Sequence, residues 1–184
     1  GRRGALAQLY ADTVRWIALG TLPLAVVLLV FAPDLMMLFG ADFREGAVLL
    51  RVLAGAYIVV AGSGSVGHML QMSDHQDFAF WINASMAVLN VGLNWVLIPW
   101  YGVVGAALAT GTAHVLANGF QLIGLYHYTG IQPFRRGLWK PIAAALASGG
   151  AAWALFVQLA APARWLVGIP VALLLYGGAV LVLG

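Results

Sequence analysis

The side chains that could hydrogen-bond a ligand are concentrated in stretches that are otherwise apolar. Three amides, Asn83, Asn90 and Asn94, lie in residues 78–99. In a helix, at roughly 100° per residue, they fall within about 40° of one another and therefore share one face. An unpaired amide among lipid tails costs a few kcal/mol, so this face must meet other helices or a wet cavity. In a cavity, the amides could hydrogen-bond a polar ligand.

Two neighbouring stretches repeat this pattern. In residues 103–128, the polar side chains within about 80° of one another are Thr110, His114, Asn118 and Gln121. In residues 47–72, the corresponding set within roughly 60° is Tyr57, Gly64, His68 and Gln71. Each stripe fits two interpretations, a cavity wall or hydrogen bonding between helices with no role in transport.

Arg51 lies near the start of the predicted span 47–72. If its guanidinium reaches a lumen, it could pair with an anionic group of a ligand. The alternative is that the side chain extends along the helix and places its charge at the membrane interface.

The sequence offers no set of residues for catalysis. All six carboxylates lie outside the predicted spans or at their edges: Asp12, Asp34, Asp42, Glu45, Asp74 and Asp77. Nothing near His75 completes a metal site with Asp74 and Asp77, so this turn is interpreted as a solvated polar turn. The chain has no cysteine, and its glycines do not form a phosphate-binding loop. We therefore expect no enzyme activity, no metal and no cofactor.

The elements that must position the polar stripes are membrane helices. The chain is 62% hydrophobic and 8% charged, against roughly 25% charged in soluble domains. We predict an all-α, polytopic membrane bundle of six transmembrane helices, at about 14–32, 47–72, 78–99, 103–128, 139–159 and 165–183. Pro99 and Gly102 predict a tight hairpin between the third and fourth spans. The basic groups are too few and scattered for a nucleic-acid surface.

Topology follows from the basic residues. One side would carry six of them: Arg2, Arg3, Arg15, Arg135, Arg136 and Lys140. The other side would carry Arg44, Arg51 and Arg164. The excess predicts that the first side, with both termini, is cytoplasmic.

Two groups of motifs resemble a known family. The first comprises the Asn-rich span, the turn Leu97-Ile98-Pro99-x-Tyr101-Gly102 and the helix start Gly105-Ala106-Ala107-x-Ala109-Thr110. The second runs through Leu9-Tyr10, Val14-Arg15-Trp16-Ile17, Leu22-Pro23-Leu24, Leu29 to Pro33, Leu38-Phe39-Gly40, Phe43 and Gly46-Ala47. In order and spacing, they resemble the C-terminal half of polysaccharide and lipid-linked oligosaccharide flippases. These belong to the multidrug/oligosaccharidyl-lipid/polysaccharide exporter superfamily.

The resemblance implies a multi-pass protein of the cell's inner (cytoplasmic) membrane that flips a lipid-linked oligosaccharide by alternating access. Its partners would be a polyprenyl diphosphate-linked glycan, membrane lipids and an N-terminal lobe that this chain lacks. Residues 1–132 would form the core of the C-terminal lobe, and residues 133–184 a terminal helix pair. The substrate cavity would be lined by Asn83, Asn90, Asn94, His114, Asn118, Gln121, His68 and Arg51.

Two other functions remain open. One is a multidrug or small-cation exporter of the same superfamily. The other is a structural membrane protein in which the polar stripes only hold helices together. In either transporter, no carboxylate is buried in a span, so His68 and His114 are the titratable side chains at intermediate depth.

Overall fold

The computed structural model describes residues 2–131 and, beyond them, residues 143, 147, 150, 154, 170–171 and 173–178, with side chains from residue 8 onward. In chain order, its elements are α1 (Arg2–Val30), α2 (Ala32–Met37), the 3-10 helix η1 (Ala41–Gly46), α3 (Ala47–Ser63), α4 (Val66–Met72) and α5 (Gln76–Thr129). No strand occurs in this part of the chain. The predicted all-helical class is therefore confirmed for the described residues.

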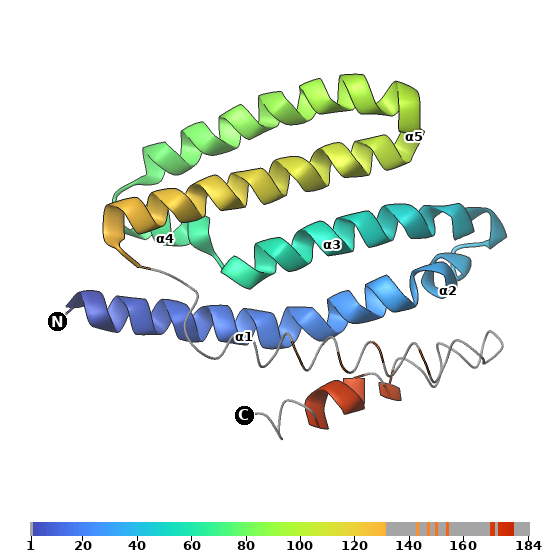
Figure 1. Ribbon diagram of the computed structural model, residues 1–184, viewed down its shortest axis with the longest axis horizontal. Helices are drawn as coiled ribbons and strands as arrows, with labels where there is room; N and C mark the ends of the chain where they lie inside the picture. The colour runs from blue at the N-terminus through green and yellow to red at the C-terminus, as the bar shows by residue number, and fades with distance from the viewer. Residues whose placement is uncertain are drawn as a thin grey trace.

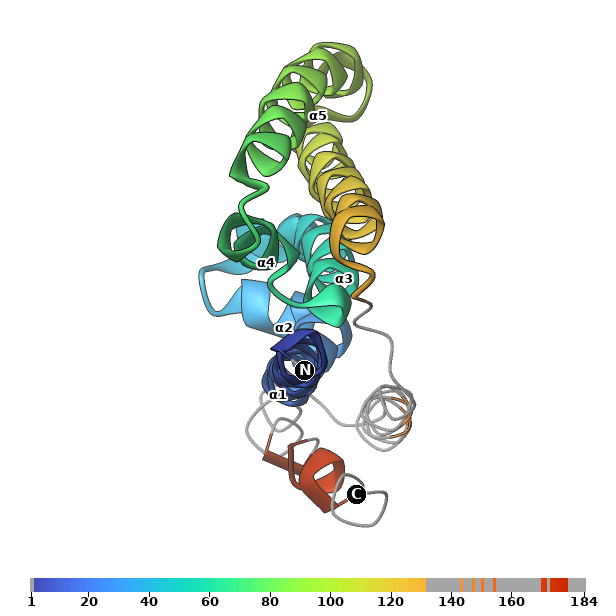
Figure 2. The same ribbon diagram turned by 90° about the vertical axis from the view of Figure 1, so that its left-hand side faces the viewer.

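The helices pack side by side in a row. α3 and α4 lie between α1 at one edge and α5 at the other (Figures 1 and 2). The buried side of α1 carries Tyr10, Val14, Ala18, Leu22 and Ala25, which follow the three-to-four-residue spacing of one helix face. Tyr10 and Val14 share a core cluster with Val66, Leu70 and Leu125 of the neighbouring helices.

α1 begins before the predicted first span and continues through Pro23 to Val30. Phe31 separates α1 from α2, and Pro33 lies in the first turn of α2. At this position the missing N–H of proline costs little. The segment after this helix is the 3-10 helix η1, and none of its residues is buried.

The predicted span 47–72 is not one continuous helix. α3 ends at Ser63, Gly64 has a φ of 71°, and α4 begins at Val66. A Cβ atom on Gly64 would lie 2.5 Å from Cγ2 of Val14, so α1 occupies the space that a side chain would need. The shared face predicted for Tyr57, Gly64, His68 and Gln71 is therefore wrong, because helical periodicity does not extend across the break.

The predicted hairpin at Pro99 and Gly102 is confirmed. α5 folds back on itself (Figure 1) at Gly102, whose φ of 55° and ψ of −134° are not helical. We call residues 76–101 the first arm and residues 103–129 the second arm. A Cβ on Gly105 would lie 2.3 Å from the carbonyl oxygen of Leu97, so the arms approach each other closely after the turn.

The second arm occupies the middle of the stack. Small residues are buried at alternate positions along it: Gly105, Ala107, Ala109, Gly111 and Ala113. Alternate positions lie on opposite sides of a helix, so the arm is covered on two sides. On one side Gly105 meets the first arm, and on the other Gly111 lies against Cβ of Ala56 in α3.

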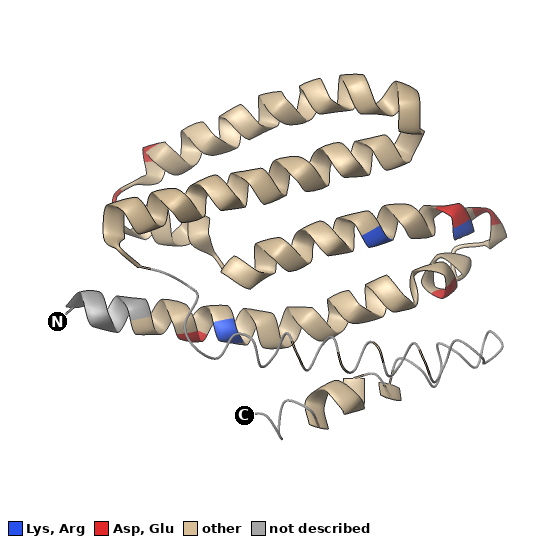
Figure 3. Ribbon diagram, in the orientation of Figure 1, with Lys and Arg blue, Asp and Glu red and all other residues tan. Residues whose placement is uncertain are grey.

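Among the residues that the structure describes, three stretches are long and apolar enough to cross a membrane: Gln8–Val30, Ala41–Met72 and Gln76–Thr129. The third has 54 residues, which would measure about 80 Å as a straight helix, well over twice a bilayer core. Its hairpin gives each arm the length of one crossing. Charged residues lie mainly at the turns at the two ends of the bundle (Figure 3).

The predicted fifth and sixth spans, 139–159 and 165–183, fall largely outside the described residues. The residues described within them are helical, and Tyr176 packs with Ala18 and Leu22 of α1. The total of six spans and the division at residue 132 stay predictions.

Candidate functional site

One polar contact joins the two arms of α5 near their open end. Gln121 donates from Nε2 to Oδ1 of Asn83 at 2.9 Å. Gln121 is buried, whereas Asn83 is exposed. The Gln121 amide also packs against Gly67 of α4, where a Cβ would lie 3.1 Å from its Oε1. The predicted stripes of both arms therefore meet here, and Gly67 makes room for the amide.

A second polar contact lies further along the arms. Asn94 donates from Nδ2 to the backbone oxygen and to Oδ1 of Asn90, at 2.8 Å and 2.9 Å. Asn90 in turn donates to the hydroxyl of Thr110 on the second arm, at a long 3.4 Å. Asn90 and Asn94 are both half-buried. These two amides mainly bind each other, and Thr110 links them to the other arm.

A third contact joins α1, α3 and the second arm at the helix break. Tyr10 donates its hydroxyl to the backbone oxygen of Ser63 at 2.7 Å, and the Ser63 hydroxyl donates to Val60 at 2.8 Å. The same hydroxyl contacts Oδ1 of Asn118. Sequence reasoning missed Ser63. Its position directly before a glycine in an apolar span was the available signal, since polar groups there can satisfy the free carbonyls of a helix end.

The remaining candidates lie apart from these amides. His114 packs against Tyr57, with the ring centroids 5.6 Å apart, and His68 is exposed on α4. Arg51 is exposed and donates from Nε to the backbone oxygen of Leu29 at 3.0 Å. That oxygen belongs to the last turn of α1, where a cation is favoured by the helix dipole. Arg51 therefore ties α3 to the end of α1.

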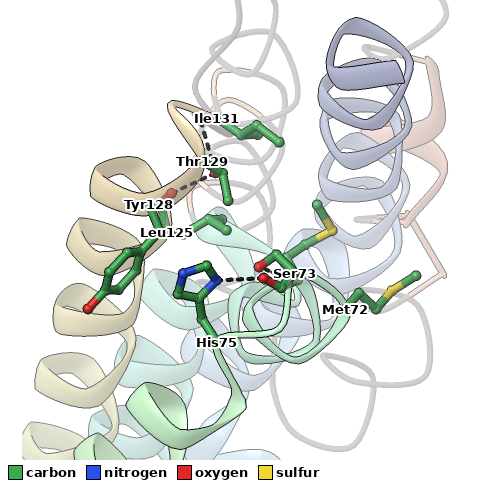
Figure 4. Close-up of a pocket in the computed structure, with 8 residues that line it drawn as sticks. Met72, Ser73, His75, Leu125, Tyr128, Thr129 and Ile131 are labelled. Carbon is green, nitrogen blue, oxygen red and sulfur yellow. Dashed lines mark hydrogen bonds between the residues drawn. The ribbon is translucent and has the colours of Figure 1, made fainter. Parts of the chain in front are cut away.

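A cavity of about 250 Å³ lies where α4 meets the end of the second arm (Figure 4). Its lining comprises Met69, Met72, Ser73, His75, Leu125, Tyr128, Thr129 and Ile131, and it contains none of the eight candidates. Nδ1 of His75 lies 2.5 Å from the Ser73 carbonyl oxygen, and the imidazole stacks on Tyr128 at 4.2 Å. Ser73 and Thr129 donate their hydroxyls to carbonyls of their own helices.

A second cavity, of about 300 Å³, lies between α3 and the second arm: its lining comprises Val52, Ala56, Leu108, Gly111, Thr112, Val115 and Leu116. It also contains none of the eight candidates. Within the described part of the chain, no group of three His, Cys, Asp or Glu side chains is placed to hold a metal ion. The turn predicted to be solvated leaves Asp74 and Asp77 exposed.

The contact between Asn83 and Gln121 gives a first prediction. Gln121→Ala should lower the free energy of unfolding by about 1–3 kcal/mol, because it removes a buried amide and its hydrogen bond. In a double-mutant cycle with Asn83→Ala, the coupling should be about 0.5–1 kcal/mol. The measurement is unfolding of the detergent-solubilised protein. Thr112→Ala, an exposed polar change on the same arm, should be additive with Asn83→Ala; equal coupling for both pairs would contradict the assignment.

Comparison with known proteins identifies one relative. The chain is 36% identical over 84 residues to the "Probable low-salt glycan biosynthesis flippase Agl15" of Haloferax volcanii. The matched segment covers 45% of this chain and 18% of that protein. No family model matches the chain, and no solved structure matches it. The chain is thus similar, over less than half its length, to a glycan flippase, and it has several apolar helices able to cross a membrane.

Proposed function

We propose that this chain is part of a flippase that moves a lipid-linked oligosaccharide of the polyprenyl diphosphate type across the inner (cytoplasmic) membrane. The observation that carries the proposal is the 36% identity to the glycan flippase of Haloferax volcanii. The long apolar helices, and the hydrogen bonds between polar side chains of the two arms of α5, also support the proposal. The glycan would move through a polar cavity, while the polyprenyl tail stays in lipid.

The contacts of the candidate residues divide them into two groups. Gln121 and Asn118 use their side chains to join helices, and Asn94 is bonded to Asn90 within the first arm. Asn83, His68 and His114 are exposed, so we propose that these three bind sugar hydroxyls, whereas the half-buried Asn90 is bonded to Asn94 and Thr110. Alternating access would require a second lobe, which we place in the part of the transporter that lies outside this chain.

A structural role without transport is the second candidate function. The paired amides favour it, because hydrogen bonds between membrane helices stabilise a bundle whether or not anything is transported. The two functions predict different consequences for exposed polar side chains, since an exposed side chain contributes little to packing.

The test is reconstitution of the complete protein in liposomes with a fluorescent lipid-linked oligosaccharide, whose transfer between leaflets is measured. Asn83→Ala and His114→Ala should each slow transfer on the order of ten-fold, the equivalent of one lost hydrogen bond of about 1.4 kcal/mol in the transition state. Ser85→Ala, an exposed polar change outside the candidate set, should leave the rate unchanged.

Three outcomes would reject the proposal in different ways. Absence of transfer by the unmodified protein would exclude flipping of this substrate. Transport of an organic cation in its place would identify the exporter alternative. Lower thermal stability of Asn83→Ala and His114→Ala with unchanged transfer would assign these residues a structural role.

A further inference from the structure

The first arm of α5 has one face that no described element covers. The arm lies at the edge of the stack (Figure 2), with the second arm on its inner side. We call its large exposed side chains that fall within about 100° of one another the outer face: Phe80, Trp81, Val88, Val91 and Trp95. This surface is too apolar to remain in water, so its natural contact must be lipid or protein.

Two exposed tryptophans toward the ends of this arm are separated by about the thickness of a membrane core. Trp81 is 68% exposed and Trp100 is 82% exposed. They are 19 residues apart, which corresponds to about 28 Å along a helix, close to the roughly 30 Å of a bilayer core. Tryptophan is enriched at both membrane interfaces because its ring is largely apolar and its N–H is polar.

The surface between the two tryptophans is apolar throughout its central part. From residue 86 to residue 98, every exposed residue is apolar: Ala87, Val88, Val91, Gly92, Trp95, Val96 and Ile98. The polar side chains of this segment, Asn90 and Asn94, hydrogen-bond each other, and Asn90 also bonds to the second arm. The exposed polar residues Asn83 and Ser85 lie within about 6 Å of the level of Trp81. A water-filled cavity would not be lined in this way.

We infer that the outer face is a lipid-contact surface, with Trp81 at one membrane interface, Trp100 at the other and acyl chains against Val88 and Val91. Asn90 then lies about 14–15 Å from each interface, at the middle of the bilayer. A second lobe or a second copy of this chain must therefore contact a different face. The inference concerns the surroundings of the arm and does not depend on the identity of any transported substrate.

The test is spin labelling of single cysteines in the complete protein in phospholipid vesicles, on a background without other cysteines. This chain contains none. Collision rates with oxygen, which concentrates in lipid, and with a water-soluble nickel chelate are measured at positions 81, 88, 91 and 100. Glu45→Cys in the exposed 3-10 helix is the aqueous control.

Positions 88 and 91 should collide several-fold more often with oxygen than with nickel, and Glu45→Cys should show the reverse. Positions 81 and 100 should lie at intermediate, equal depths. Low collision rates with both reagents at 88 and 91 would show that protein covers this face, and high nickel rates would show a wet cavity. Either result would overturn the inference. Two central positions are used so that one misfolded variant does not decide the outcome.

Discussion

Gly105→Ala is expected to destabilise the protein by about 3 kcal/mol or more, the upper range for overpacking a well-packed interior. The added Cβ would lie 2.3 Å from the carbonyl oxygen of Leu97, 2.6 Å from its carbon and 3.0 Å from the nitrogen of Ile98. All three are backbone atoms of the first arm. No side chain can rotate away, so the clash must separate the arms next to the turn.

The matched control is Gly92→Ala on the first arm of the same hairpin. Nothing lies within 4 Å of the position that its Cβ would occupy. Alanine there should be neutral or stabilising by about 0.5–1 kcal/mol, because glycine is a poor helix former. Unfolding of the detergent-solubilised protein, followed by circular dichroism, measures both variants. Equal effects of the two substitutions would contradict the close approach of the arms.

The hairpin that Gly105 supports could be predicted from sequence because its signals are local. Pro99 and Gly102 lie between two apolar runs, and each run is long enough to cross a membrane. The structure places the reversal at Gly102. Close packing just after the turn was not evident, because it depends on which atoms of the first arm face Gly105.

The break after Ser63 was not predicted for a related reason. The apolar pattern of residues 47–72 continues across Gly62, Gly64 and Gly67, so it predicted one continuous span. Gly64 instead has the left-handed φ of a helix end. Whether a glycine in an apolar run permits packing or ends a helix depends on tertiary contacts, here those from Val14 and Tyr10 of α1.

The polar stripes could be predicted as faces but not as contacts. Periodicity placed Asn83 and Gln121 on two polar helix faces that are unsuited to contact with lipid. The structure joins these two side chains by a hydrogen bond. Periodicity could not show that Arg51 binds the end of α1, because it describes one helix at a time.

The helix break gives the second large effect. Gly64→Ala should destabilise the protein by about 2–5 kcal/mol, because two costs combine. The φ of 71° with a ψ of −158° at Gly64 is a conformation that essentially only glycine adopts and costs another residue about 1–3 kcal/mol, and the Cβ would also lie 2.5 Å from Cγ2 of the fully buried Val14. Overpacking of this kind typically costs about 1–3 kcal/mol. The same unfolding measurement applies.

Two further variants separate these costs. Gly130 has the ordinary left-handed conformation, with a φ of 69° and a ψ of 8°, and nothing lies within 4 Å of its Cβ position, so Gly130→Ala should show only a backbone cost of roughly 1–2 kcal/mol and destabilise less than Gly64→Ala. Val14→Ala removes the clashing methyl group, so its double variant with Gly64→Ala should be less destabilised than the sum of the single variants. Additive effects, or equal effects of the two glycine substitutions, would mean that α1 does not occupy the space beside Gly64. The break would then be set by the glycine alone, and not by the packing of α1 against it.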